Sequence, residues 1–325
     1  MGIRSITFFA VAAALLTGAL SSGPATAEEL AFESDGWVET AAPGDDTPAA
    51  ELAEIRLLLR TDQLRAAFRA ARAFVRSHPD DPGVEEALFL AGEAQLQRQR
   101  WWSAYAWFER LLARAPIGPL YERALRREAV IGEAFLAGAK RPLWGLIPLP
   151  ATDEGIEILQ RVADRLPGSP LAARSLMRIG DFQFDRRRWV DAAATYQEYL
   201  ERFRGRYRSD EALLKAARST DRQFIDVHHD DTPLIEAEQL YRQYLAQHGR
   251  QGGAEEAAAA LRRIRTLQAE QDYLRGRFYE RIGRPVSARV YYRDVIARYP
   301  DTPWAARGAE ALEALGVESD RESTP

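Results

Sequence analysis

Apolar residues recur along much of the chain with the spacing of one face of an α-helix, and residues 273–300 show this most clearly. There a small residue, Ala288, is followed four, seven and eleven positions later by Tyr292, Val295 and Tyr299. Pro300 comes next, and because proline removes a backbone hydrogen bond, the pattern predicts a helix that ends there. Gly283 and Pro285 interrupt the pattern upstream, so we expect two helices joined by a tight turn.

A small residue with apolar residues at +4 and +7 occurs six times along the chain. The six small residues are Ala67, Ala104, Gly155, Ala192, Ala237 and Ala288. Position +12 holds a helix-stopping proline or glycine in five of the six copies. Three copies also have a glycine twelve residues before the small residue, and these are Gly92, Gly180 and Gly276. We interpret these glycines as positions where the two helices of a hairpin approach closely.

The repeated unit predicts an all-α fold, a tetratricopeptide-type superhelical solenoid of about six helical hairpins plus a terminal capping helix. In the third copy Gly132 lies 23 residues before Gly155, so that turn should hold about eleven extra residues. The fifth copy needs an enlarged turn around residues 228–233. The predicted solenoid spans residues 49–315 and is followed by a polar tail, 316–325. No alternating run of β-branched residues predicts a sheet.

The N-terminus has the features of a secretory signal peptide over residues 1–27. Arg4 precedes an apolar run, Ile6 to Leu20, and Ala25-Thr26-Ala27 supplies the small residues of a cleavage site. The alternative is a membrane anchor, but about 15 apolar residues are short for a span. We therefore expect secretion across an inner membrane into a periplasm, with residues 28–48 as a flexible, polar lead-in.

Composition and the absence of familiar catalytic patterns exclude several function classes. The 325 residues carry a net charge of only −4, which gives no indication of a nucleic-acid partner. Cysteine is absent, which excludes disulfides, thiolate metal sites, cysteine nucleophiles and a lipid anchor on this sequence. No Ser/His/Asp set, acid pair or phosphate-binding glycine loop stands out. We expect no cofactor and no catalysis, and an accessory or degenerate enzyme domain is the remaining alternative.

Residues 71–95, 189–203 and 279–308 resemble the periplasmic tetratricopeptide proteins of outer-membrane β-barrel assembly, the BamD-like family. The resemblance covers residues 50–315 and implies a scaffold that holds a β-barrel insertase subunit and substrate segments. Periplasmic scaffolds that coordinate cell division and the cell envelope end their repeats in the same way, so they remain the alternative. Two departures are the missing lipid-bearing cysteine and a sixth hairpin where the family usually has five.

The insertion at residues 141–150 is the first candidate for partner binding. Three prolines argue against a helix there, yet the stretch is rich in large apolar residues. The candidate contact residues are Pro142, Leu143, Trp144, Leu146, Ile147 and Pro148. An exposed loop of this composition marks a contact with a partner protein or with the inner leaflet of the outer membrane. The alternative is that it folds back over the groove of the solenoid.

Two tryptophans, Trp102 and Trp107, are the second candidates, because helical spacing turns them away from the face shared by Trp101, Tyr105 and Phe108. Exposed aromatic residues on the concave face of a solenoid can anchor a peptide. The alternative is that these two tryptophans belong to the core or are exposed only incidentally.

Two polar clusters complete the candidates. The sequence His228-His229-Asp230-Asp231 contains metal-ligand types, but adjacent residues in a turn rarely complete a site, so we interpret it as a solvated loop and predict no metal site. Arginines at 186–188 and 202–208 form either a solvated edge or a surface for an acidic partner or lipid headgroups.

Overall fold

The computed structural model describes residues 29–33, 36–40, 47–143, 147–227, 230–250 and 252–322. This described part contains thirteen helices and four short strands. The helices are α1 (Pro48–Arg60), α2 (Leu64–Ser77), α3 (Val84–Gln97), α4 (Trp101–Arg114), α5 (Pro119–Leu136), α6 (Thr152–Arg165), α7 (Pro170–Asp185), α8 (Trp189–Arg202), α9 (Ser209–Asp221), α10 (Thr232–His248), α11 (Ala254–Arg281), α12 (Pro285–Arg298) and α13 (Pro303–Glu322). The strands are β1 (Glu29–Glu33), β2 (Gly36–Thr40), β3 (Lys140–Leu143) and β4 (Ile147–Pro150).

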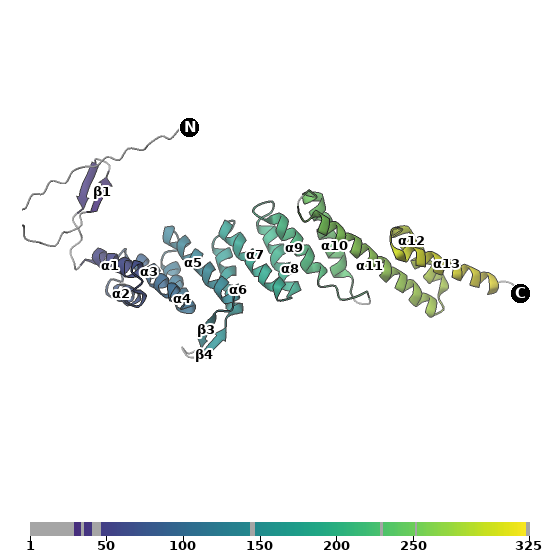
Figure 1. The fold of residues 1–325 in the computed structure, drawn as a ribbon, viewed down its shortest axis with the longest axis horizontal. Helices are drawn as coiled ribbons and strands as arrows, with labels where there is room; N and C mark the ends of the chain where they lie inside the picture. Colours follow the sequence, from purple (N-terminus) through teal and green to yellow (C-terminus); the bar gives the residue numbers. More distant parts are fainter. Residues whose placement is uncertain are drawn as a thin grey trace, which may run out of the picture.

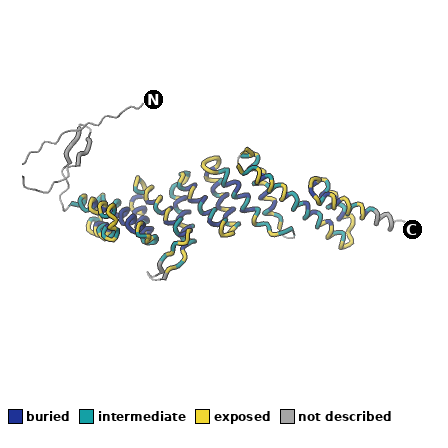
Figure 2. Tube along the Cα trace, in the orientation of Figure 1, coloured by how far each residue is buried: buried dark blue, intermediate teal, exposed yellow. Residues whose placement is uncertain are grey.

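The helices form a row in which each packs against the next in chain order, from α1 to α13 (Figure 1). Consecutive helices pair into six hairpins, α1–α2 to α11–α12, and α13 follows the last. Buried residues form a band along the row, while exposed residues lie at the turns (Figure 2). The predicted all-α, tetratricopeptide-type solenoid is confirmed. None of the described helices combines the length and apolar content needed to cross a bilayer.

The repeated glycines lie where each hairpin is most tightly packed. A Cβ atom added to Gly92 would meet the Phe108 ring at 2.5 Å, and one added to Gly180 would meet Tyr196 at 2.6 Å. The same addition at Gly276 would meet Tyr292 at 2.6 Å. Each glycine of the first helix therefore faces the aromatic ring that lies four residues after the small reference residue of the second helix. Because the glycine has no side chain, the two helices of the hairpin can approach closely. The six small reference residues are all buried.

Four of the hairpins turn through only three residues, and the middle residue has a positive φ in each. These middle residues are Asp62, Gln99, Arg187 and Gly283, with φ of 60°, 56°, 58° and 70°. Only glycine adopts this left-handed conformation without strain. Three of the four turns therefore use a less favoured residue in a geometry that the surrounding helices impose.

Buried apolar residues form three clusters rather than one. The largest extends from Leu52 in α1 to Ala216 in α9, and the second covers α9, α10 and the first half of α11. Leu200 and Leu240 pack against both of these clusters. The third consists of Ala288, Tyr292 and Leu315, and its partly buried neighbours belong to neither of the others. The last hairpin and α13 therefore have a small core of their own.

Two antiparallel β-hairpins differ from the prediction that no sheet would form. β1 and β2 pair between Glu29↔Thr40 and Glu33↔Gly36, inside the segment expected to be a flexible lead-in. β3 and β4 pair within the insertion of the third repeat, with Pro142 opposite Pro148. Each is a local two-stranded pairing, whereas the sequence criterion searches for a longer alternating pattern. The insertion is non-helical, as its prolines predict.

The C-terminal helix is longer than expected. The sequence predicts a capping helix that ends at Leu315 before a polar tail, whereas α13 continues to Glu322. Gly316 lowers helix propensity, but a single glycine does not end a helix, and no proline follows until Pro325.

Candidate functional site

The hairpin β3–β4 projects from the row of helices between α5 and α6 (Figure 1). Its root is held by Arg141, whose Nε lies 2.6 Å from Glu154 Oε1 in α6 as an ion pair. The guanidinium carbon of the same arginine lies 5.5 Å from the centre of the Trp102 ring in α4. One side chain thus ties the strand to two helices, which fixes where the hairpin leaves the solenoid.

The structure places the predicted contact residues of this hairpin only in part. Trp144 and Leu146 lie outside the described residues. Only the backbones of Pro142, Leu143 and Ile147 are described, in β3 and β4. Pro148 is exposed. Because prolines lack an N–H donor and both strands are edges, the hairpin is poorly suited to pairing with a third strand. Any partner would have to be recognised mainly through side chains.

The two candidate tryptophans occupy different environments. Trp102 is half-buried beside the hairpin root, with its ring 5.5 Å from Tyr105 and 6.4 Å from Phe135. Trp107 is only 9% exposed, because Phe68 of the preceding hairpin packs edge-on against it at 5.7 Å. Trp107 therefore belongs to the core, which was the alternative, and its candidacy as an exposed peptide anchor is wrong. A periodicity within one helix does not reveal which face the neighbouring hairpin covers.

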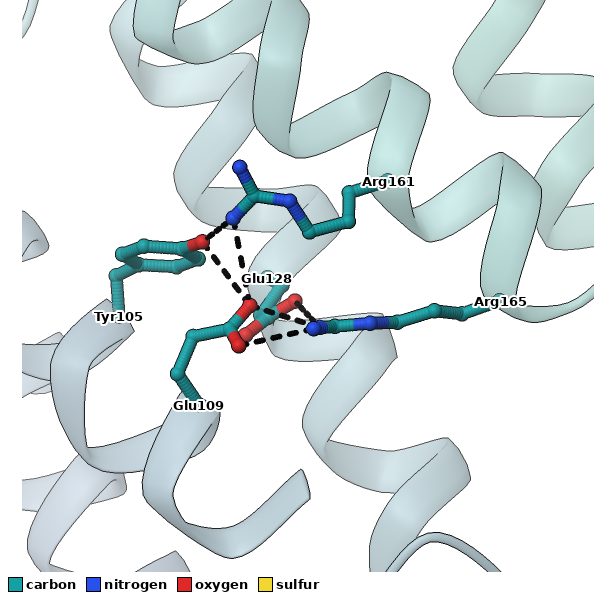
Figure 3. Close-up of polar contacts among 5 residues, drawn as sticks. All are labelled: Tyr105, Glu109, Glu128, Arg161 and Arg165. Atoms are coloured by element: carbon teal, nitrogen blue, oxygen red, sulfur yellow. Dashed lines mark hydrogen bonds and ion pairs between the residues drawn. The ribbon is translucent and has the colours of Figure 1, made fainter. Parts of the chain in front are cut away.

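A partly buried polar network lies next to this region, between α4, α5 and α6 (Figure 3). It consists of five side chains: Tyr105, Glu109, Glu128, Arg161 and Arg165. Arg165 donates two hydrogen bonds to Glu109, from Nη1 at 2.7 Å and from Nη2 at 2.9 Å. Its Nη1 also lies 3.4 Å from Glu128 Oε2. The Tyr105 hydroxyl donates to Glu109 at 2.9 Å and contacts Arg161.

Glu128 is the unusual member of this network because it is fully buried. Its Oε1 has no hydrogen-bond partner. Burial and the negative charge of Glu109 raise the pKa of Glu128 to about 9, although Arg165 opposes both effects. For Glu109, burial would raise the pKa, but hydrogen bonds from Arg165 and Tyr105 outweigh burial and lower it. Glu128 is thus the protonated and Glu109 the ionised carboxyl at neutral pH.

The network links three helices, and its Glu128 carboxyl is sealed from solvent. Sequence reasoning missed it, although a signal was present. Glu128 interrupts an apolar stripe of α5, whose members at −4, −3, +3 and +4 are all buried; these are Ala124, Leu125, Ile131 and Gly132. A charged residue at the centre of such a stripe is a strong indication of a buried polar contact.

The other two polar clusters behave as surface features where the structure describes them. His228 and His229 lie outside the described residues, while Asp230 accepts hydrogen bonds from Thr232. No group of three or more potential metal ligands occurs among the described residues. In the arginine-rich region, Arg202 pairs with Asp164 at 2.6 Å and Arg188 pairs with Asp191 at 2.8 Å. These two arginines are therefore engaged within the protein.

Comparison with known proteins agrees with the architecture. Family models described as "Tetratricopeptide repeat" match residues 52–119, 152–207 and 272–302. These segments correspond to α1–α4, α6–α8 and the second half of α11 with α12. No curated protein matches the chain. Together with the stacked hairpins, the family matches show that these segments of the chain are tetratricopeptide repeats. Repeats of this kind are protein-interaction scaffolds and are generally not enzymes.

Three solved structures illustrate the similarity. One is the C-terminal part of a TPR repeat-containing protein from Cytophaga hutchinsonii, with 13% identity over 82% of this chain and 88% of that chain, TM-score 0.38. Another is a tetratricopeptide repeat protein from Parabacteroides merdae, with 14% identity over 82% of this chain and 98% of that chain, and a TM-score of 0.34. The third is PilW, a type IV pilus biogenesis factor, with 16% identity over 83% of this chain and 98% of that chain, and a TM-score of 0.29.

Proposed function

We propose that this tetratricopeptide-repeat protein is a periplasmic scaffold that holds a partner protein during the assembly of outer-membrane β-barrels. Three observations support the proposal. The fold is an interaction scaffold, residues 1–27 have the sequence features of a secretory signal peptide, and three segments resemble the BamD-like family. By that resemblance, the partner is a β-barrel insertase subunit or a segment of a substrate barrel.

The observation that carries the proposed binding role is the anchored hairpin β3–β4. An insertion that served only to join α5 to α6 would not need a paired root, yet Arg141 fixes this one to both α4 and α6. The sequence between the strands, Trp144-Gly145-Leu146, adds aromatic and aliphatic residues to the apolar ends of both strands. Large apolar residues presented on a fixed support are the usual anchors of a protein interface. Peripheral contact with the outer membrane is the second use that this composition allows.

The test is to replace residues 142–150 by a flexible glycine-serine linker and to co-purify partners from crosslinked cell envelopes. A matched control is Val190→Ser, which changes an exposed apolar residue of α8 (67% exposed) far from the hairpin in sequence. We expect the linker variant to melt like the wild type and to lose its partner, while the control keeps it. Partner recovery that does not change in the linker variant would refute the role of the hairpin.

The identity of the co-purified protein tests the process. Recovery of a β-barrel insertase would support barrel assembly. Recovery of peptidoglycan synthases would instead assign the protein to the alternative, the coordination of the cell envelope and cell division.

A further inference from the structure

A groove at the last hairpin combines apolar and aromatic walls with arginines. It has a volume of ≈930 Å³ and lies along the second half of α11. Its lining residues include Leu274, Arg277, Phe278, Tyr279, Arg281 and Tyr291. The Tyr279 and Tyr291 rings stack at 5.3 Å with an interplanar angle of 11°, which joins α11 to α12 along one wall. Val227, from the loop between α9 and α10, also lines the groove.

Apolar residues are unusually exposed around this groove. Leu274 and Phe278 of α11 and Ile282, the residue directly after this helix, follow one another at intervals of four, the spacing of one helix face. Phe278 is 47% exposed and Ile282 is 48% exposed. Val286 and Val290, on the first turns of α12, are 73% and 54% exposed. Large apolar residues that gather at the surface in this way mark an interaction site.

The local charge is opposite to that of the chain as a whole. Residues 271–298 contain seven arginines and three acidic residues, although the whole chain carries a net charge of −4. Of the acidic residues, Asp272 is buried and pairs with both Arg275 and Arg298. Arg277 lies 3.8 Å from Glu280, a loose contact.

Arg281 is the arginine best placed to receive an anionic ligand. In the part of the chain that the structure describes, it makes no ion pair, and its guanidinium carbon lies 5.9 Å from the centre of the Phe278 ring. Arg277 and Arg281 are four residues apart, so their side chains leave α11 on the same face. A guanidinium group offers donors in the geometry of a carboxylate, which makes carboxylates a suitable partner for this pair.

We infer that this groove, which we name the α11 groove, binds an acidic peptide segment of another protein that also carries apolar or aromatic side chains. Its carboxylates pair with Arg277 and Arg281, and its apolar side chains pack on Leu274 and Phe278. A single-stranded nucleic acid fits less well, because the Glu280 carboxylate also lines the groove and would repel its phosphates. The α11 groove is separate from the hairpin β3–β4, so the two sites are independent.

The test is a fluorescence anisotropy titration of the full chain with a short labelled peptide that alternates Asp or Glu with Leu or Phe. Three counter-probes define the chemistry: the same peptide with lysine in place of the acids, the same peptide with serine in place of the apolar residues, and a labelled oligothymidylate. We expect only the acidic, apolar peptide to bind, with an affinity that falls as salt concentration rises. Equal binding of the basic peptide or of the oligonucleotide would overturn the inference.

Substitutions locate the site. Arg281→Glu and Phe278→Ser should each weaken binding about tenfold or more, since charge reversal and loss of an apolar anchor act on the two halves of the recognition. Matched controls are Arg204→Glu and Val190→Ser, which change exposed residues of the same types in the fourth repeat. Thermal melting shows that each variant is folded. Binding that survives both groove substitutions, or self-association without peptide binding, would overturn the inference. Because the linker variant of residues 142–150 should still bind this peptide, failure here is distinguishable from failure of the proposed hairpin function.

Discussion

Replacing Glu128 with glutamine is expected to stabilise the protein at neutral pH and to remove a pH dependence that the buried carboxyl imposes. Glu128 lies between α4 and α6 with one oxygen unpartnered and the other 3.4 Å from Arg165. The side chain is protonated at neutral pH in the folded protein, because its pKa is raised to about 9 by burial and by Glu109. Glutamine has nearly the same shape as this neutral acid and cannot ionise.

The magnitude follows from the difference in pKa between the two states. The folded pKa of about 9 exceeds the ordinary value of 4.5, so the folded state binds more protons than the unfolded state throughout that interval. The free energy of unfolding therefore falls as pH rises from 4.5 towards 9, by about 1.4 kcal/mol per pH unit. From the ordinary value to pH 7 this amounts to about 3 kcal/mol. Glu128→Gln should recover an amount of this order at pH 7 and almost nothing near pH 4.5.

The assay is denaturant unfolding followed by far-ultraviolet circular dichroism at several pH values between 4.5 and 9. The control is Glu133→Gln, which changes a partly exposed glutamate of the same helix and should leave the pH dependence as it is in the wild type. The stability difference between Glu128→Gln and wild type should grow steadily with pH. If the two stability curves ran parallel, the carboxyl would not be protonated in the folded protein, and the assignment of Glu128 as the neutral acid would be refuted.

Three further substitutions test the packing and the polar contacts. Gly180→Ala should destabilise the protein by about 1–3 kcal/mol, because the added Cβ lies 2.6 Å from Tyr196. Its control, Gly316→Ala, has open space around the added Cβ and should be neutral or slightly stabilising. Equal effects of the two substitutions in thermal melts would contradict the packing argument. Arg165→Ala should lower the free energy of unfolding by about 3 kcal/mol in denaturant titrations, because it leaves the partly buried Glu109 without its two hydrogen bonds from Arg165. The control is Arg126→Ala, which removes an exposed arginine. A loss no larger than that of the control would show that the network is not stabilising. Arg141→Ala should release the root of the hairpin β3–β4. Amide hydrogen exchange should therefore accelerate in residues 140–150 but not in α7. Unchanged exchange in the hairpin would exclude Arg141 as its anchor.

The repeat architecture can be predicted from the sequence because the contacts within a hairpin lie at fixed offsets. The distance from Gly180 to Ala192 reports a helix, a short turn and a second helix, so it predicts the pairing of α7 with α8. The enlarged turn after α9 follows from the same spacing. The spacing of the repeat is therefore sufficient to predict the number and order of the hairpins.

Contacts between hairpins cannot be predicted in this way, because they depend on how successive hairpins stack. The burial of Trp107 by Phe68 and the contact of Glu109 with Arg165 both cross from one hairpin to another. Sequence reasoning missed the α11 groove for a related reason. The repeat pattern assigns residues 273–300 to packing, and this holds for Tyr292 and Val295 but not for Phe278 or Ile282, which remain exposed.

The separate core of the last hairpin has a mechanical consequence. Ala288, Tyr292 and Leu315 share no apolar neighbours with the other two clusters, so α12 and α13 are attached to the rest of the row chiefly through one continuous helix, α11. The second half of α11 is in turn tied to the start of α10 by a polar contact, Arg275 with Asp231 at 3.1 Å. Under force applied to its ends, the protein should therefore yield first at this C-terminal unit while the longer N-terminal part keeps its shape. A ligand in the α11 groove, which includes Tyr291 of α12 and Val227 of the preceding loop, would span that weak point and stiffen it.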